Sequence, residues 1–227
     1  MTSLLTATAA LMAPAFVVAG SAISWLELLA LVLAIWMVLC NLRVHPLAWP
    51  LAMASSALYG VLFLHSRLYG QAGLQLLFIA LAAWGWWQWL HGTGETGQPL
   101  RVRALARPQR LQVAVLTLAA WPLLGLLLQR ATDSDVPYLD ALPTVGSIAG
   151  QLLLARKRVE NWPVWLAVNL VSVLLFSVQG LWLTAALYAL FAALAVVGWR
   201  AWARLADADA DADADAGAGA GAGAARG

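Results

Sequence analysis

The chain has 227 residues, of which 63% are hydrophobic and 11% charged, with a formal net charge of +2 and a mean hydropathy of +0.79. A soluble domain carries roughly 25% charged residues, so this composition excludes a soluble globular protein and indicates an integral membrane protein. The single cysteine, Cys40, excludes an internal disulfide, and three scattered histidines form no metal-binding pattern. We therefore expect neither a metal nor a cofactor.

The N-terminal segment, residues 1–21, is apolar but contains no Lys or Arg, and Pro14 and Gly20 interrupt it. A secretory signal peptide begins with basic residues, so we reject that interpretation. The segment is expected to be a short helix along or within the membrane, or a further span over residues 4–18. The sequence leaves this choice open.

Seven apolar runs of bilayer length follow, at residues 24–40, 49–64, 68–90, 111–128, 139–154, 162–178 and 181–202. They divide the chain into a first three-helix repeat (22–90), a basic cytoplasmic loop (91–110), a linker helix (111–129) and a second three-helix repeat (130–203). The remaining residues, 204–227, consist largely of alternating Asp, Ala and Gly with no apolar face to bury. We predict that this tail is disordered.

Residues of the second half of the chain align with residues of the first half when the sequence is shifted by a constant number of positions. This repeat offset is the difference in residue number between Trp49 and Trp162. With this repeat offset Trp49-Pro50 aligns with Trp162-Pro163, and a Gly-Trp-x-x-Trp motif at Gly85 aligns with one at Gly198. Such a match of rare residues in one register indicates an internal repeat. Two three-span repeats joined by one linker span are parallel, and transporters built in this way bind substrate near the membrane midplane between the repeats.

The positive charges predict the orientation in the membrane. Eleven of the 13 Lys and Arg residues fall on one side of the seven-span arrangement, and only Arg67 and Arg130 fall on the other. Because cytoplasmic loops carry the excess of positive charge, the N-terminus is predicted outside the cell and the C-terminus inside. The arginines of residues 101–110 are expected to contact anionic lipid.

Polar and aromatic residues share one face of the sixth span. Trp162, Trp165, Asn169 and Ser172 recur at three- and four-residue spacing, which places them on the same side of a helix. An unpaired amide in a bilayer costs several kcal/mol, so Asn169 faces protein, water or a ligand. We predict that the two indoles form a clamp for a flat, polar molecule.

The repeat offset adds further candidates for substrate contact. Gln75 and Tyr188 occupy equivalent positions deep in their spans. Glu27 and Asp140 align in the same way, and we interpret them as acids at helix N-termini rather than cation ligands. The tryptophans at the cytoplasmic span ends are predicted to form an interfacial belt, namely Trp86, Trp89, Trp199 and Trp202.

No catalytic pattern occurs in the sequence. There is no Ser-His-Asp set, no paired histidines on a helix and no Gly-rich phosphate loop. We therefore predict that the protein is not an enzyme and that it does not bind nucleic acid.

Several motifs resemble the PnuC-type vitamin transporters, which include nicotinamide riboside transporters. The resemblance covers residues 24–202 and is most specific in the Arg-Lys-x-x-Glu-Asn-Trp-x-x-Trp run from Arg156 to Trp165. It implies an all-α fold like that of full-length SWEET sugar transporters, with three-plus-one-plus-three helices. It also implies facilitated diffusion in the inner membrane, trapping of the substrate by a cytoplasmic kinase, and a homo-oligomer.

The resemblance also implies which residues line the site. The Trp-x-x-Trp stretch and polar residues of the central helices do so in the family, which here are Trp162, Trp165, Asn169, Gln75, Tyr59 and Tyr188. Nicotinamide riboside and thiamin both carry a positive aromatic ring, which indoles attract by up to about 2 kcal/mol. The chain has Ala82-Ala83-Trp84 where the family is expected to have an amide, so the substrate stays open.

The leading hypothesis is therefore a nicotinamide riboside uniporter. The alternatives are a transporter of thiamin or another flat vitamin through the same fold, and a membrane scaffold or sensor. No intramembrane Lys occurs, and no acid occurs there except Glu27 and Asp140, which argues against coupling to protons or sodium.

Overall fold

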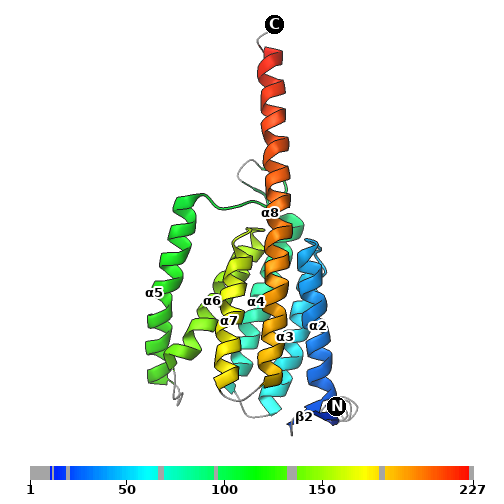
Figure 1. Ribbon diagram of the computed structural model, residues 1–227, viewed down its shortest axis with the longest axis vertical. Coiled ribbons are helices and arrows are strands. Elements are labelled where there is room, and N and C mark those ends of the chain that lie inside the picture. Colours follow the sequence, from blue (N-terminus) through cyan, green and yellow to red (C-terminus); the bar gives the residue numbers. More distant parts are fainter. Residues whose placement is uncertain are drawn as a thin grey trace. The chain divides into compact units, whose positions relative to one another are not determined.

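The computed structural model describes residues 11, 13–18, 21–65, 69–94, 97–131, 137–178 and 182–224. Within these residues the chain forms two strands and seven helices (Figure 1). They belong to two compact units, Met1–Leu90 and His91–Gly227, each with its own internal packing. The seven predicted spans all coincide with helices, and five of these helices are long and apolar enough to cross a membrane: α2, α3, α5, α7 and α8.

The first unit begins with a β-hairpin rather than a helix. Strand β1 (Pro14–Val18) pairs antiparallel with β2 (Ser21–Ser24), with Phe16 opposite Ile23 and Val17 opposite Ala22. The prediction of a helix or span over residues 4–18 is wrong for residues 14–18, and residues 1–10 lie outside the described residues. Valine and isoleucine favour the extended backbone, and Pro14 cannot donate a helical hydrogen bond.

Helix α2 (Trp25–Leu42) begins at a capping box, and Glu27 lies at the N-terminus of this helix, as predicted. Ser24 is the N-cap, and the Glu27 carboxylate accepts from both the backbone nitrogen (2.7 Å) and the hydroxyl (2.8 Å) of Ser24. The backbone nitrogen of Glu27 donates to the Ser24 hydroxyl at 3.2 Å. The carboxylate is thus engaged in the cap, where it also complements the helix dipole.

Helices α3 (Ala48–His65) and α4 (Tyr69–His91) complete the first unit. The Ser55 hydroxyl donates to the carbonyl oxygen of Ala30 on α2 at 3.1 Å. Trp49 on α3 lies against Gly85 and Trp89 on α4. These contacts join all three helices of the unit.

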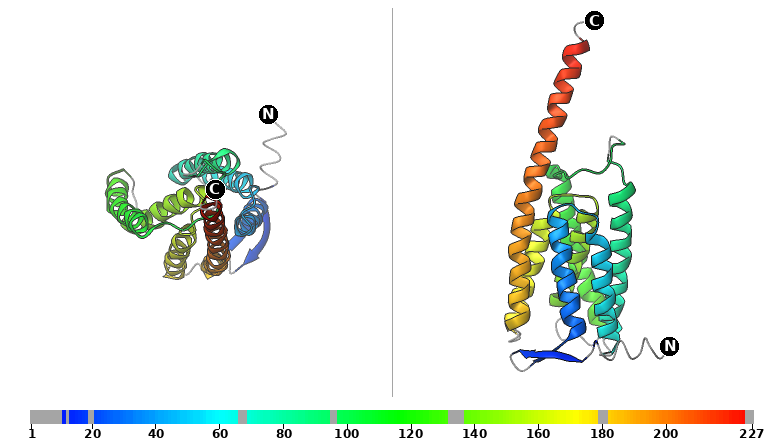
Figure 2. Two further views of the ribbon diagram at one scale, coloured as in Figure 1. Left: turned by 90° about the horizontal axis from the view of Figure 1, so that it is seen from above. Right: turned by 90° about the vertical axis from the view of Figure 1, so that its right-hand side faces the viewer.

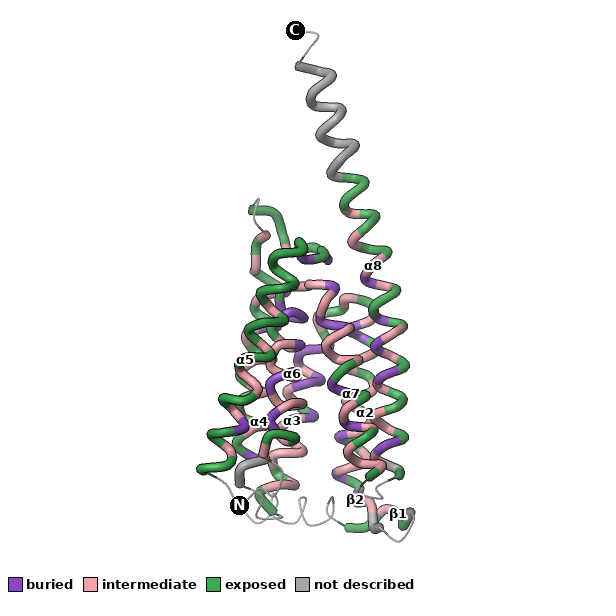
Figure 3. The backbone as a smooth tube through the Cα atoms, turned by 60° about the vertical axis from the view of Figure 1, so that its left-hand side comes forward, coloured by how far each residue is buried: buried purple, intermediate pink, exposed green. Residues whose placement is uncertain are grey.

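The second unit contains α5 (Arg107–Ala131), α6 (Pro137–Ala155), α7 (Asn161–Val178) and α8 (Trp182–Ala224). The Trp121 indole nitrogen on α5 donates to the carbonyl oxygen of Tyr138 on α6 at 2.6 Å. Helix α5 is exposed over most of its length, and Gly125 is its one buried residue (Figure 3). The linker helix is therefore held to α6 near Trp121 and Gly125, and near its start by the ion pair between Arg110 and Glu160 at 2.8 Å.

Helix α8 extends to Ala224, so the prediction of a disordered tail over residues 204–227 is wrong for residues 204–224. This part continues past the ends of α6 and α7 as a single helix (Figure 2). Alanine is the best helix former and supplies every second residue here. The preceding span already forms the helix, so the costly nucleation step is avoided.

The turn before the second helix of each predicted repeat has the same hydrogen bonds. In the first unit the backbone nitrogens of Arg43 and His45 donate to the carbonyl of Cys40, at 3.1 and 2.9 Å. Residues 156 and 158 donate in the same way to the carbonyl of Leu153, at 3.2 and 2.9 Å. Val44 and Lys157, which the repeat offset also aligns, both have positive φ, at 52° and 51°. The offset thus relates local backbone structure as well as residue identity.

Candidate functional site

One face of α7 packs along α8 at two levels. Trp162 lies against Gly198 and forms an edge-to-face pair with Trp202, with ring centroids 5.6 Å apart. Phe176, almost four turns further along α7, stacks on Tyr188 with centroids 5.2 Å apart and planes at 22°. These two aromatic contacts fix the antiparallel register of the helix pair.

Asn169 lies between these contacts on the same face of α7. It is seven residues from both Trp162 and Phe176, close to two full helical turns. The register places the α8 turn around Ala192 and Ala195 opposite it, and both of these alanines are buried. The α7–α8 interface thus has small residues at the level of the Asn169 amide. Bulky aromatic rings fill the interface about two turns before and two turns after that level.

Asn169 is a buried residue whose carboxamide forms no hydrogen bond with the part of the chain that the structure describes. Asn169 is only 7% exposed, and no described residue forms a hydrogen bond with its side chain. Leaving such a group unsatisfied costs about 1–3 kcal/mol. The role of Asn169 in binding a ligand stays a prediction, and this arrangement leaves its amide able to accept and donate hydrogen bonds.

The two predicted clamp tryptophans contact different helices. Trp162 is 4% exposed, and its indole lies against α8. Trp165 lies against Gly150 of α6, next to the contact between Val168 and Gly146. The prediction that Trp162 and Trp165 form one clamp is therefore wrong, because α7 is packed between α6 and α8 and presents one indole to each.

Ser172 and Tyr188 are both engaged within the second unit. The Ser172 hydroxyl donates to the carbonyl oxygen of Val168 at 2.9 Å, one turn earlier on its own helix. Tyr188 stacks on Phe176 and lies edge-on to Phe191, with centroids 6.3 Å apart. Tyr188 is thus held in a fixed orientation on the side of α8 that meets α7.

The first unit places its two candidates near each other on α3 and α4. Tyr59 stacks on Phe63 of the same helix, with centroids 6.1 Å apart and planes at 23°. The Cβ atom of Gln75 on α4 would be 3.6 Å from a Cβ atom at Gly60, so the two helices approach closely there. Both side chains are half-buried.

Phe63 and Phe176 were not among the predicted site residues. The repeat offset aligns them, and each stacks on a candidate tyrosine, Tyr59 in the first unit and Tyr188 in the second. The repeat alignment of the Leu-Phe pairs could have identified them. Because both residues are apolar, nothing in the sequence except the repeat register distinguishes them from residues of the helix packing.

A family profile described as nicotinamide mononucleotide transporter matches residues 24–204 of this chain. The chain belongs to this family. It is 28% identical over 170 residues to the nicotinamide riboside transporter PnuC of Escherichia coli (strain K12), covering 64% of this chain and 71% of that protein. It is 30% identical over 191 residues to the riboflavin/roseoflavin transporter RibM of Streptomyces davaonensis, covering 83% of this chain and 89% of that protein.

A solved structure agrees with this assignment. The crystal structure of the vitamin B3 transporter PnuC aligns with a TM-score of 0.66 at 25% identity, covering 81% of this chain and 82% of that one. The chain is thus a predominantly helical membrane protein of the PnuC-type vitamin transporter family, and the resemblance inferred from the motifs is confirmed. The named relatives are transporters of different vitamins, nicotinamide riboside and riboflavin.

Proposed function

We propose that this chain is a uniporter for nicotinamide riboside and that Asn169 binds the substrate. The observation that carries the proposal is that Asn169 is a buried residue whose carboxamide has no hydrogen-bond partner among the described residues. A carboxamide both donates and accepts, so it suits the amide or the ribose hydroxyls of this substrate. Sequence similarity to PnuC over 170 residues supports the choice of vitamin.

Aromatic rings on α7 and α8 supply the second part of the proposed recognition. Tyr188 and Phe176 lie on the same α7–α8 face, and Trp165 is half-buried one turn before the amide. A positive aromatic ring is attracted to such faces. Tyr59 and Gln75 of the first unit are proposed as further contacts, and Ser172 as an acceptor through its remaining lone pair.

Transport is proposed to follow the substrate gradient without a coupling ion. Helices α3, α4 and α7 contain no Asp, Glu, Lys or Arg. Glu27 is engaged in its capping box, and Asp140 lies in the first turn of α6. Intramembrane ionisable groups mark most proton and ion pathways, so their scarcity supports facilitated diffusion, with trapping by a cytoplasmic kinase.

We also propose a three-plus-one-plus-three organisation as in SWEET transporters, a homo-oligomer, and the inner membrane as its location, with the C-terminus cytoplasmic. The turn hydrogen bonds shared at the repeat offset support the repeat. The arginine-rich segment before α5 supports the orientation.

Riboflavin is the second candidate substrate. The match to RibM covers 83% of this chain at 30% identity, more of the chain than the match to PnuC covers. Riboflavin is also a flat aromatic vitamin with hydroxyl groups, but its ring system is neutral. The charge of the ring therefore distinguishes the two candidates.

Calorimetry on the purified protein tests the proposal. We expect nicotinamide riboside to bind and Asn169→Leu to weaken this binding about tenfold, the loss of one buried hydrogen bond. Ser172→Ala removes a weaker proposed contact and should lower affinity less than about threefold, because the Ser172 hydroxyl already donates to Val168.

Each other outcome overturns a stated part of the proposal. Binding of riboflavin alone would show that riboflavin, not nicotinamide riboside, is the substrate, and the proposed site would stand. Unchanged binding in Asn169→Leu would remove this residue from the site. If neither vitamin binds and cells expressing the protein take up neither, a scaffold or sensor role would replace transport.

A further inference from the structure

The second unit contains an apolar cavity of about 580 Å³ between α5, α6 and α7. Val113, Ala114 and Leu118 line it from α5, and Leu142, Ala167 and Val171 line it from α6 and α7. Pockets of roughly 300–1,000 Å³ hold small organic ligands. The lining positions of α7 lie opposite its α8-facing residues, so this cavity does not include Asn169.

The length of the cavity corresponds to one leaflet of a bilayer. Arg110 and Trp121 both line it and are eleven residues apart on α5. With a rise of about 1.5 Å per residue, this separation is about 16 Å. The hydrocarbon core of a bilayer is about 30 Å thick, so one leaflet contributes about 15 Å. An extended acyl chain therefore fits the long dimension.

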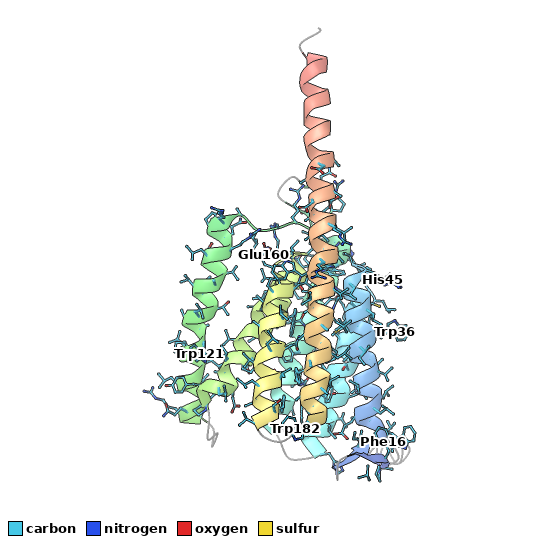
Figure 4. All side chains as sticks on the ribbon, in the orientation of Figure 1. Phe16, Trp36, His45, Trp121, Glu160 and Trp182 are labelled. Atoms are coloured by element: carbon cyan, nitrogen blue, oxygen red, sulfur yellow. The ribbon has the colours of Figure 1, made fainter. Side chains whose placement is uncertain are left out.

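The two ends of the cavity differ in polarity. At one end the Arg110 Nε atom is 2.8 Å from a Glu160 carboxylate oxygen, and the same carboxylate accepts from the backbone nitrogen of Leu105 at 3.0 Å. At the other end lies Trp121, whose indole donates to the carbonyl of Tyr138. Figure 4 labels Glu160 beside the segment that leads to α5 and Trp121 further along that helix.

The surroundings of the polar end are positively charged. Arg107 is exposed and lies one turn before Arg110, and Arg101 and Arg103 precede it in the chain. Glu160 offsets one of these charges and orients the Arg110 side chain. Arg107 therefore adds a positive charge beside the Arg110–Glu160 ion pair at this end of the cavity, which matches the phosphate of an anionic lipid.

A second copy of the chain is a poorer match for this site. Copies inserted in the same membrane have the same orientation, so a neighbour would bring its own arginine-rich segment to the same level. Like charges would then meet at the polar end of the cavity. An anionic lipid instead complements both the charge and the apolar wall.

We propose that the cavity binds one acyl chain of an anionic phospholipid and that Arg107 and Arg110 bind its phosphate. The lipid then fills the space between the linker helix and the helices α6 and α7, which the protein itself leaves open. This lipid site is independent of the vitamin site on the other face of α7.

Native mass spectrometry on the full chain in detergent tests the proposal. The protein is first stripped of lipid and then given phosphatidylglycerol or phosphatidylcholine with identical acyl chains. We expect one tightly retained phosphatidylglycerol and weaker retention of phosphatidylcholine. Arg107→Gln and Arg110→Gln should each lower retention about fivefold. The matched control is Arg130→Gln at the opposite end of α5, which should not change it.

A second set of variants fills the cavity. Ala114→Trp should abolish lipid retention, whereas Ala119→Trp, on α5 but outside the cavity, should leave it intact. If Ala114→Trp does not fold, Ala167→Trp fills the same space from α7. Equal retention of both lipids by the wild type, or full retention in both arginine variants, would overturn the proposal. So would a cavity-filling variant that keeps its lipid but changes the oligomeric mass, because a second copy would then occupy the cavity.

Discussion

Trp162 and Trp202 form an edge-to-face pair, with ring centroids 5.6 Å apart and planes at 83°. Trp49 and Trp89 form the same pair in the first unit, at 5.4 Å and 88°. Trp89 and Trp202 are buried, so the prediction that they belong to an interfacial belt is wrong. Trp86 and Trp199 are exposed, as residues of a belt would be. The Gly-Trp-x-x-Trp motif thus specifies a helix contact through its glycine and its second tryptophan.

The glycine of this motif is required by the close approach of an indole. A Cβ atom at Gly198 would lie 2.5 Å from the Trp162 ring. We expect Gly198→Ala to lower the free energy of unfolding by about 1–3 kcal/mol, as overpacking does. Thermal unfolding in detergent measures this change. Gly73→Ala is the control, since a Cβ atom there has no neighbour within 4 Å, and it should stabilise α4 by about 0.5–1 kcal/mol. A stable Gly198→Ala protein would contradict the packing described.

The Trp162 indole contributes through its rings rather than through its N–H group. Its Nε1 atom is buried without a hydrogen-bond partner among the described residues, as is that of Trp49. Trp162→Ala should cost about 3–5 kcal/mol of unfolding free energy, the range for large aromatic residues in cores. Trp162→Phe removes the unsatisfied donor and keeps an aromatic ring, so it should cost much less. Equal losses in the two variants, measured by thermal unfolding, would show that the indole nitrogen has a partner.

A strained valine occurs in the turn between α2 and α3. Val44 has a φ of 52°, which β-branched residues rarely adopt. Such strain costs about 1–3 kcal/mol, more than the roughly 0.5–1 kcal/mol of chain entropy that glycine loses. Val44→Gly should therefore raise the melting temperature. Lys157→Gly, at the equivalent turn with a φ of 51°, should raise it less, because lysine is not β-branched and the change also removes the hydrogen bond from Nζ to the Leu100 carbonyl. A lower melting temperature for Val44→Gly would show that its side-chain contacts outweigh the strain.

Much of the fold could be predicted from the sequence because spans and repeats leave strong patterns. Bilayer-length apolar runs located every helix from Trp25 onward, and the repeat offset related the paired indoles and the two turns. The hairpin at Pro14–Val18 was missed because short apolar runs suit strand and helix alike. The helical tail was missed because the Asp/Ala/Gly composition shows only that the segment has no apolar face to bury. It does not show that the segment continues a helix, α8, that has already formed.

The candidate site was less predictable, because helix periodicity places residues on a face but does not say which neighbour meets that face. Asn169 could be selected from the cost of burying an amide. Trp162 and Trp165 are three residues apart, so their directions differ by about 60°, and this is enough to put them against different helices. The aromatic partners Phe63 and Phe176 needed the repeat register, since nothing else separates them from other apolar residues.

The carboxylate of Glu160 should matter more for stability than its cationic partner. It is 16% exposed and accepts hydrogen bonds from Leu105 and Arg110, whereas the Arg110 side chain is 53% exposed. Glu160→Gln should cost about 1–3 kcal/mol of unfolding free energy, because hydrogen bonds to a buried charge are lost. Arg110→Gln should cost less than about 1 kcal/mol, as for other exposed ion pairs. The reverse order in thermal unfolding would contradict this assignment.

Lys157, in the turn between α6 and α7, should make stability depend on alkaline pH. Burial lowers the pKa of its amine below the ordinary lysine value, and its Nζ atom donates to the carbonyl oxygen of Leu100 at 2.9 Å. Between the lowered pKa and the ordinary value, the unfolded chain binds more protons than the folded chain does. Stability therefore rises as the pH rises through this window, because the folded protein releases a proton that burial disfavours. As the pH falls below the window, this contribution is lost and the folded protein must bury the charge.

The matched variant Lys157→Gln lacks this titration but keeps a side-chain donor for the Leu100 carbonyl. Melting temperatures of the wild type and of this variant, measured from neutral pH to the ordinary lysine pKa, give the difference that belongs to Lys157. We expect the wild type to gain stability relative to the variant as the pH rises. A difference that stays constant would show that the amine is as well solvated in the folded chain as in the unfolded one, and a difference that moves in favour of the variant would show that the fold stabilises the charged amine. In that case the hydrogen bond to Leu100, rather than the cost of burial, would determine how Lys157 contributes to the turn.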